Sequence, residues 1–84
     1  MIKYYNRNTL VEALHWDGTL GTFNRILMWT KFEMRMDENK NLIIQGADED
    51  IIWPLGCWIC LNKHGNWNLY NDSYFHKTFE AVND

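Results

Sequence analysis

The chain has 84 residues, of which 46% are hydrophobic and 15% aromatic, and a formal charge of −3. A chain this short closes one hydrophobic core, so we predict a single domain over residues 1–84. No apolar run approaches the roughly 20 residues of a membrane span, and Met1–Tyr5 lacks the hydrophobic stretch of a signal peptide. The dispersed basic residues and the negative charge argue against direct binding of nucleic acid. We therefore expect a cytoplasmic protein without membrane association.

The N-terminal part of the chain predicts a strand followed by a helix. Thr9–Trp16 has the β-branched and aromatic character of a strand and runs into the turn-forming pair Asp17-Gly18. Thr19 or Thr22 is suited to cap a helix that ends near Lys31. The apolar face expected on this helix comprises Phe23, Ile26, Leu27 and Thr30.

The next segment predicts a hairpin. Apolar and polar residues alternate over residues 32–37, and after the polar segment Glu38-Asn39-Lys40 the apolar run resumes at Leu42–Ile44. Alternation with period two places one set of side chains on each face of a strand. We therefore expect two antiparallel strands here.

A second hairpin is predicted towards the C-terminal end. Ile51–Trp53 is followed by the turn Pro54–Gly56, which leads into Cys57–Leu61. His64-Gly65 suits a two-residue hairpin tip, because glycine adopts positive φ at little cost, and Trp67 and Leu69 continue the returning strand.

The chain closes with a short helical turn and an extended tail. Asn71 or Asp72 is suited to cap the turn that carries Phe75, and residues 79–82 read as a last strand. Trp58 and Phe75 are predicted core residues, and Phe75 with Phe79 should pack this turn back on the sheet. The elements together predict an α+β fold, with a small, mainly antiparallel sheet of about five short strands, one main helix and a short C-terminal helical turn.

Three segments, taken in order, resemble an abundant family of small bacteriophage and prophage proteins. Val11–Gly18 reads V-E-A-L-H-W-D-G, Gly56–Ile59 reads G-C-W-I, and Phe75–Glu80 reads F-H-K-T-F-E. The family pairs V-E-A-x-x-W with a later G-D-W-I and a closing F-x-x-T-Y-E. Cys57 replaces the family's Asp, and Phe79 replaces its Tyr. The resemblance implies a phage origin and the cytoplasm of a bacterial host, and it implies no enzymatic activity.

The spacing of Cys57, Cys60 and His64, with His76 or His15 as a fourth ligand, is one that Zn²⁺ can use. A regular strand would place Cys57 and Cys60 on opposite faces, so both could bind one ion only where the strand is broken. The alternative is a pair of buried free thiols. We favour the thiols and expect no cofactor, and we keep a small zinc-stabilised module as a second hypothesis.

The same residues give no convincing catalytic site. A redox Cys-x-x-Cys motif needs a helix N-terminus that lowers the pKa of a thiol, whereas Cys57 and Cys60 lie in a predicted strand. A cysteine nucleophile with a histidine base lacks a recognisable oxyanion hole or a third orienting residue. We therefore predict a non-enzymatic protein.

The run Asp48-Glu49-Asp50 lacks the spaced ligands, the central Gly and the distal Glu of a calcium-binding loop. It predicts a solvated acidic loop that is able to contact a basic surface on a partner protein. The leading hypothesis is a phage-encoded protein that binds and inhibits a host or defence protein. An anti-CRISPR protein that contacts a Cas effector is its most specific form.

A third hypothesis rests on the aromatic residues. The chain has five Trp, four Tyr and four Phe, and rings of this kind are enriched in interfaces. Exposed rings would bind sugars or single-stranded nucleic acid by stacking. The alternative is that most of the rings fill the core, and the negative charge of the chain argues against the nucleic-acid version.

Overall fold

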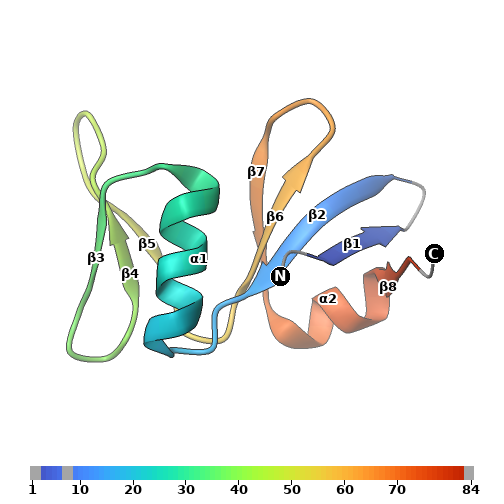
Figure 1. Ribbon diagram of the computed structural model, residues 1–84, viewed down its shortest axis with the longest axis horizontal. Helices are drawn as coiled ribbons and strands as arrows, with labels where there is room; N and C mark the ends of the chain where they lie inside the picture. The colour runs from blue at the N-terminus through green and yellow to red at the C-terminus, as the bar shows by residue number, and fades with distance from the viewer. Residues whose placement is uncertain (1–2, 7–8, 83–84) are drawn as a thin grey trace. The chain divides into compact units, whose positions relative to one another are not determined.

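The computed structural model describes residues 3–6 and 9–82. Within these ranges the chain forms two antiparallel sheets and two helices, which confirms the predicted α+β class (Figure 1). The fold divides into two compact units. The first consists of Met1–His15 together with Cys57–Asp84, and the second of Trp16–Gly56.

The first unit contains a five-stranded antiparallel sheet and a short helix. Its strands follow the order β7-β6-β2-β1-β8, so the central strand β2 pairs with β1 on one side and with β6 on the other. Both ends of the chain therefore contribute to one sheet. The elements are β1 (Lys3–Asn6), β2 (Leu10–His15), β6 (Trp58–Asn62), β7 (Trp67–Tyr70), α2 (Asp72–Thr78) and β8 (Glu80–Ala81).

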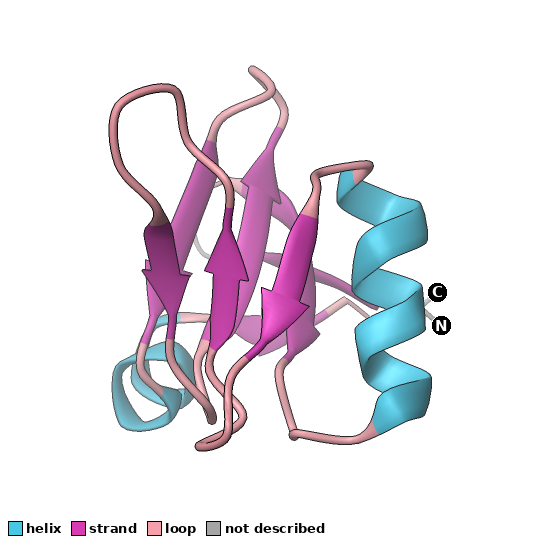
Figure 2. Ribbon diagram, turned by 90° about the vertical axis from the view of Figure 1, so that its left-hand side faces the viewer, coloured by secondary structure: helices cyan, strands magenta, loops and turns pink. Residues whose placement is uncertain are grey.

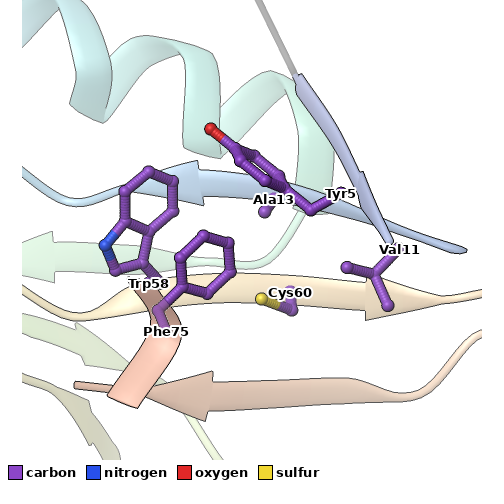
Figure 3. Packing of buried hydrophobic residues seen from close by; sticks show 6 residues of the cluster. All are labelled: Tyr5, Val11, Ala13, Trp58, Cys60 and Phe75. Atoms are coloured by element: carbon purple, nitrogen blue, oxygen red, sulfur yellow. The ribbon is translucent and has the colours of Figure 1, made fainter. Parts of the chain in front are cut away.

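Helix α2 packs on one face of this sheet through Phe75. The Phe75 ring is fully buried and stacks on Trp58, with 4.0 Å between ring centroids and 2° between ring planes (Figure 3). The Tyr5 ring lies nearly perpendicular to both of these rings, with its centroid 4.9 Å from that of Phe75 and 5.7 Å from that of Trp58. Trp58 and Phe75 are thus core residues, as the sequence predicts. The buried cluster comprises Tyr5, Val11, Ala13, Trp58, Cys60 and Phe75.

The ends of α2 follow from the local sequence. The side-chain oxygen of Asn71 accepts a hydrogen bond from the backbone N–H of Tyr74 at 2.7 Å, which satisfies one of the unpaired amides of the first turn. After the helix, the backbone N–H of Phe79 bonds to the carbonyl of Phe75 at 2.8 Å, and Phe79 packs against the buried cluster. The predicted cap and the predicted packing of Phe79 are both confirmed.

The second unit contains the longer helix α1 and a three-stranded antiparallel sheet in the order β3-β4-β5. Figure 2 shows this helix alongside its sheet. All three side chains of the middle strand β4 are buried, and strands pair with it on both sides. The elements are α1 (Leu20–Thr30), β3 (Met34–Met36), β4 (Leu42–Ile44) and β5 (Ile51–Trp53).

Helix α1 begins at the predicted cap and buries a slightly different face from the one expected. The Thr19 hydroxyl accepts from the N–H of Thr22 at 3.2 Å. Thr22, Ile26 and Thr30 are buried, whereas the predicted Phe23 and Leu27 are half-buried. Two small hydroxyl side chains tolerate this burial because both are hydrogen-bonded. Thr30 donates to the carbonyl of Ile26 at 2.9 Å, and Thr22 bonds to a carboxylate oxygen of Asp17 at 3.1 Å.

Two expectations about the sheets are corrected by the structure. The strands form two sheets rather than one, and the described residues contain eight strands rather than about five. The additional strand β1 has little strand signal of its own. It is held by backbone pairing with the next strand β2 and with the distant strand β8, since Tyr5 lies opposite both Val11 and Ala81.

The tip of the β6-β7 hairpin also differs from the prediction. The loop has three residues, Lys63–Gly65, rather than the two residues His64-Gly65. The N–H of Gly65 bonds to the carbonyl of Asn62 at 3.0 Å, and Gly65 has a φ of 83°. The Asn62 side chain accepts from the N–H groups of His64 and Asn66. A turn followed by a left-handed glycine is the usual geometry of a three-residue hairpin loop.

Candidate protein-binding site

The acidic loop predicted from the sequence connects β4 to β5 in the second unit. Asp48, Glu49 and Asp50 are all exposed, which confirms the prediction of a solvated loop. Gly46 gives the loop its tight path, because a Cβ at this position would overlap the backbone carbonyl oxygen of Glu49. The three carboxylates are therefore presented to solvent by a loop whose backbone doubles back on itself.

The charge of this loop is only partly balanced by neighbouring residues. A guanidinium nitrogen of Arg35 on β3 lies 3.7 Å from a carboxylate oxygen of Asp50, and both side chains are largely exposed. An exposed pair of this kind contributes little to stability. Among residues 3–6 and 9–82, neither Asp48 nor Glu49 forms an ion pair.

Two large apolar side chains follow the loop directly. Ile51 and Ile52, the first two residues of β5, are 51% and 58% exposed. Their strand partners Ile44 and Ile43 on β4 are buried. Residues 48–52 thus form one continuous exposed segment, with three acidic residues followed by two isoleucines. We call residues 48–52 the acidic-apolar segment. The sequence indicated its acidic half and missed its apolar half, because Ile51-Ile52-Trp53 reads as a buried strand.

The predicted zinc ligands are not brought together. Cys57 and Cys60 are buried free thiols, Cys60 within the cluster under α2. His64 is exposed at the tip of the β6-β7 hairpin, and His76 is exposed on α2. Across the described part of the chain, no group of three or more His, Cys, Asp or Glu side chains is arranged to hold a metal ion. The zinc hypothesis therefore receives no support from the geometry.

The environment of the two thiols also disfavours thiolate chemistry. Burial raises the pKa of Cys57 to about 11. Burial, together with the nearby Cys57, raises the pKa of Cys60 to about 12. A nucleophilic or metal-binding cysteine acts as a thiolate, and both of these thiols stay protonated at neutral pH. They act as small core residues.

Two histidines and a carboxylate meet around Trp58 in the first unit, an arrangement that sequence reasoning missed. The indole Nε1 of Trp58 donates to Oδ1 of Asp72 at 2.8 Å. Nε2 of His76 lies 3.1 Å from the same oxygen and Nε2 of His15 lies 4.0 Å from it. The His15 ring also stacks on Trp58. The spacing of Asp72 and His76, four residues apart on a helix, was the one signal available in the sequence.

This cluster makes stability depend on pH through Asp72. The hydrogen bond from Trp58, followed by the positive charge that His76 and His15 carry when protonated, lowers the pKa of Asp72. A carboxyl group whose pKa is lower in the folded state stabilises the fold above its unfolded pKa of about 3.9, and the contribution is lost as the pH falls through the folded value. We expect Asp72→Asn to lower the free energy of unfolding at neutral pH, and the difference from the parent protein to shrink below about pH 4.

Urea unfolding at a series of pH values measures this difference. Asp48→Asn is the control for the loss of one surface charge, and it should show no such dependence. A deficit of Asp72→Asn that stayed constant down to the lowest pH would contradict the assignment.

The aromatic hypothesis gains little from the structure. Among the aromatic side chains that the structure describes, Tyr74 is the one with a largely exposed ring, and the others are buried or half-buried. Tyr74 also stacks on Tyr70 at 5.3 Å. Stacking platforms for sugars or single strands use several exposed rings in a row, so a single ring does not make one.

Comparisons of the chain with protein-family models, with curated proteins and with solved structures found no match. The resemblance to small phage proteins therefore stays a prediction. In the described ranges no helix has the length and the apolar character needed to cross a membrane. On the surface formed by the described residues, the acidic-apolar segment is the feature that best indicates a function.

Proposed function

We propose that the protein is a phage-encoded binding protein that inhibits a host or defence protein by direct protein–protein contact, without catalysing a reaction. The observation that carries this proposal is the acidic-apolar segment, in which exposed carboxylates adjoin two isoleucines that are more than half exposed. Protein interfaces combine an apolar centre with a polar rim, and this segment supplies both.

The charge of the segment indicates the chemistry of the partner. Asp48, Glu49 and Asp50 attract a surface rich in Lys and Arg, and complementary charge speeds encounter and selects the partner. Proteins that bind nucleic acid expose such surfaces, because they neutralise phosphates. A Cas effector is therefore the most specific candidate, and contact with its basic channel would block loading or cleavage of nucleic acid.

Neutralising the loop tests this proposal. We expect the triple variant Asp48→Asn, Glu49→Gln, Asp50→Asn to keep the fold, with a free energy of unfolding within about 1 kcal/mol of the parent, because exposed charges contribute little stability. We expect the same variant to lose most of its partner binding. Circular dichroism melting measures the first effect, and capture of partners from host lysate, with and without added Cas effector, measures the second.

A matched control separates a local effect from a change in net charge. The variant Glu33→Gln, Glu38→Gln, Glu80→Gln also removes three exposed carboxylates and should bind as the parent does. Equal binding by the parent and both variants would exclude the loop from the interface. Unfolding of the loop variant would show that the carboxylates are structural.

A further inference from the structure

The strand that follows the acidic loop lies at the edge of its sheet. In the order β3-β4-β5, strand β5 pairs with β4 on one side, and on its other side it pairs with no strand formed by the described residues. At such an edge, every second residue directs its backbone N–H and C=O groups away from the sheet, where they are able to pair with another strand. The exposed Ile51 and Ile52 flank these groups on the two faces of the strand.

The two edge strands of this sheet differ in how well they are protected against pairing with a further strand. The other edge strand, β3, has a charged residue at its centre, Arg35, whose side chain is 69% exposed. A charge in the middle of an edge strand is a common device against unwanted strand pairing. Both edge strands are short, with three residues each, but β5 has two isoleucines and Trp53 and no charged residue within the strand, and Pro54 follows its last residue. The β5 edge is therefore the less protected of the two.

We propose that β5 is the docking strand for the partner, which adds an extended segment beside it as a fourth strand of the sheet. This inference rests on the proposed function and specifies how the contact is made. Backbone hydrogen bonds to β5 supply affinity, and the apolar side chains of the added segment, which share one face of the sheet, contact whichever of Ile51 and Ile52 lies on that face. The segment alternates such apolar residues with Lys or Arg.

Charge complementarity identifies this occupant. An added strand that continues past the start of β5 reaches the bent loop that carries Asp48, Glu49 and Asp50, and two of these carboxylates have no ion-pair partner among the described residues. Basic residues in the segment would pair with them. A second copy of the chain is disfavoured as the occupant, since it carries the same acidic triplet and a net charge of −3.

Synthetic peptides test the strand pairing directly. The probe is a fluorescein-labelled ten-residue peptide that alternates Lys with Val, and fluorescence anisotropy measures its binding. The same peptide with alternate backbone nitrogens methylated keeps its charge and apolar side chains but loses the N–H groups of one edge. We expect this change to raise the Kd at least about tenfold, because two or three hydrogen bonds are lost. We expect a Glu-Val peptide not to bind.

Amide hydrogen exchange locates the contact on the protein. Binding of the Lys-Val peptide should slow exchange at outward-facing amides of β5. The double variant Ile51→Lys, Ile52→Lys should no longer bind the peptide. The control variant Met28→Lys changes an apolar side chain on α1 that is 79% exposed, and it should bind the peptide with unchanged affinity. If the double variant fails to fold, the methylated peptide still decides the question, because it needs no change to the protein.

Three results would overturn the inference. The first is equal affinity of the methylated and the unmethylated peptide, and the second is failure of the Lys-Val peptide to bind at all. The third is self-association of the protein that the double variant abolishes, which would assign β5 to a second copy of the chain. The proposed function is judged separately. Suppose that the triple loop variant loses the captured partner while the β5 amides of the parent protein exchange at the same rate with and without the bound partner. In that case the proposed binding function stands and strand addition at β5 is excluded.

Discussion

Replacing Trp58 with Ala is expected to lower the free energy of unfolding by about 3–5 kcal/mol, which is most of the stability of a small domain. Trp58 is buried, its ring stacks on Phe75, and its indole N–H is bonded to Asp72. The substitution leaves a cavity beneath α2 and removes the donor that holds the start of this helix. Chemical denaturation monitored by circular dichroism measures the loss.

Two further variants show which interactions of Trp58 supply this free energy of unfolding. Trp58→Phe keeps a ring against Phe75 but removes the hydrogen bond to Asp72, so it should cost less than the Ala variant. Leu69→Ala on the neighbouring strand β7 truncates a side chain that is exposed to solvent, and its effect should be well below half as large. A Trp58→Ala protein with an unchanged melting curve would contradict the packing described above.

Replacing Trp16 with Ala is expected to have an effect of similar size on the second unit, about 3–5 kcal/mol. Trp16 is fully buried, and none of the other fully buried side chains that the structure describes is larger. Its indole N–H donates to the backbone carbonyl of Lys40 at 2.7 Å and so ties the β3-β4 hairpin loop to the start of the unit. Truncation opens a large cavity and leaves that carbonyl without its indole donor.

The control for Trp16 separates packing from hydrogen bonding. Trp16→Phe retains much of the apolar volume and loses only the donor, which should cost about 1–3 kcal/mol. Equal stability of the parent and the Ala variant would show that the ring is not part of the core. The same denaturation experiment serves for all of these variants.

The two tryptophan variants also test the prediction that residues 1–84 are one domain. Each unit holds about half of the chain, and chains of about 40 residues rarely fold alone without disulfides or metal. We therefore expect either substitution to destabilise both units together. Amide resonances from α1 and from α2, followed by NMR during thermal unfolding, report on one unit each. If α1 stays folded while α2 melts in Trp58→Ala, the chain consists of two independent domains.

Much of the local structure could be read from the sequence. The helix caps Thr19 and Asn71, the end of α1 at Lys31 and the burial of Trp58 and Phe75 follow from patterns within a few residues of each position. Caps and amphipathic spacing are local properties, because the side chain and the backbone group that it satisfies lie within one turn. The exposure of the acidic loop was likewise predictable from its charge.

The choice of strand partners was decided by the tertiary structure. A strand pattern shows that a segment is extended, but not which strand it pairs with, since pairing partners lie far apart in the chain. His15 pairs with Trp58 across more than half of the described residues, and this pairing closes one sheet and leaves β3, β4 and β5 to form another.

The same long-range pairing produced the features that the sequence did not reveal. Asp72 meets His15 only because β2 and β6 are neighbours and α2 folds back over them, whereas His76 lies one helical turn from Asp72 on α2 itself. Ile52 is exposed only because β5 ends its sheet, although its sequence is that of a buried strand. Hydrophobicity and charge along the chain thus determined the local elements, whereas the order of strands in each sheet decided which of their side chains were left exposed.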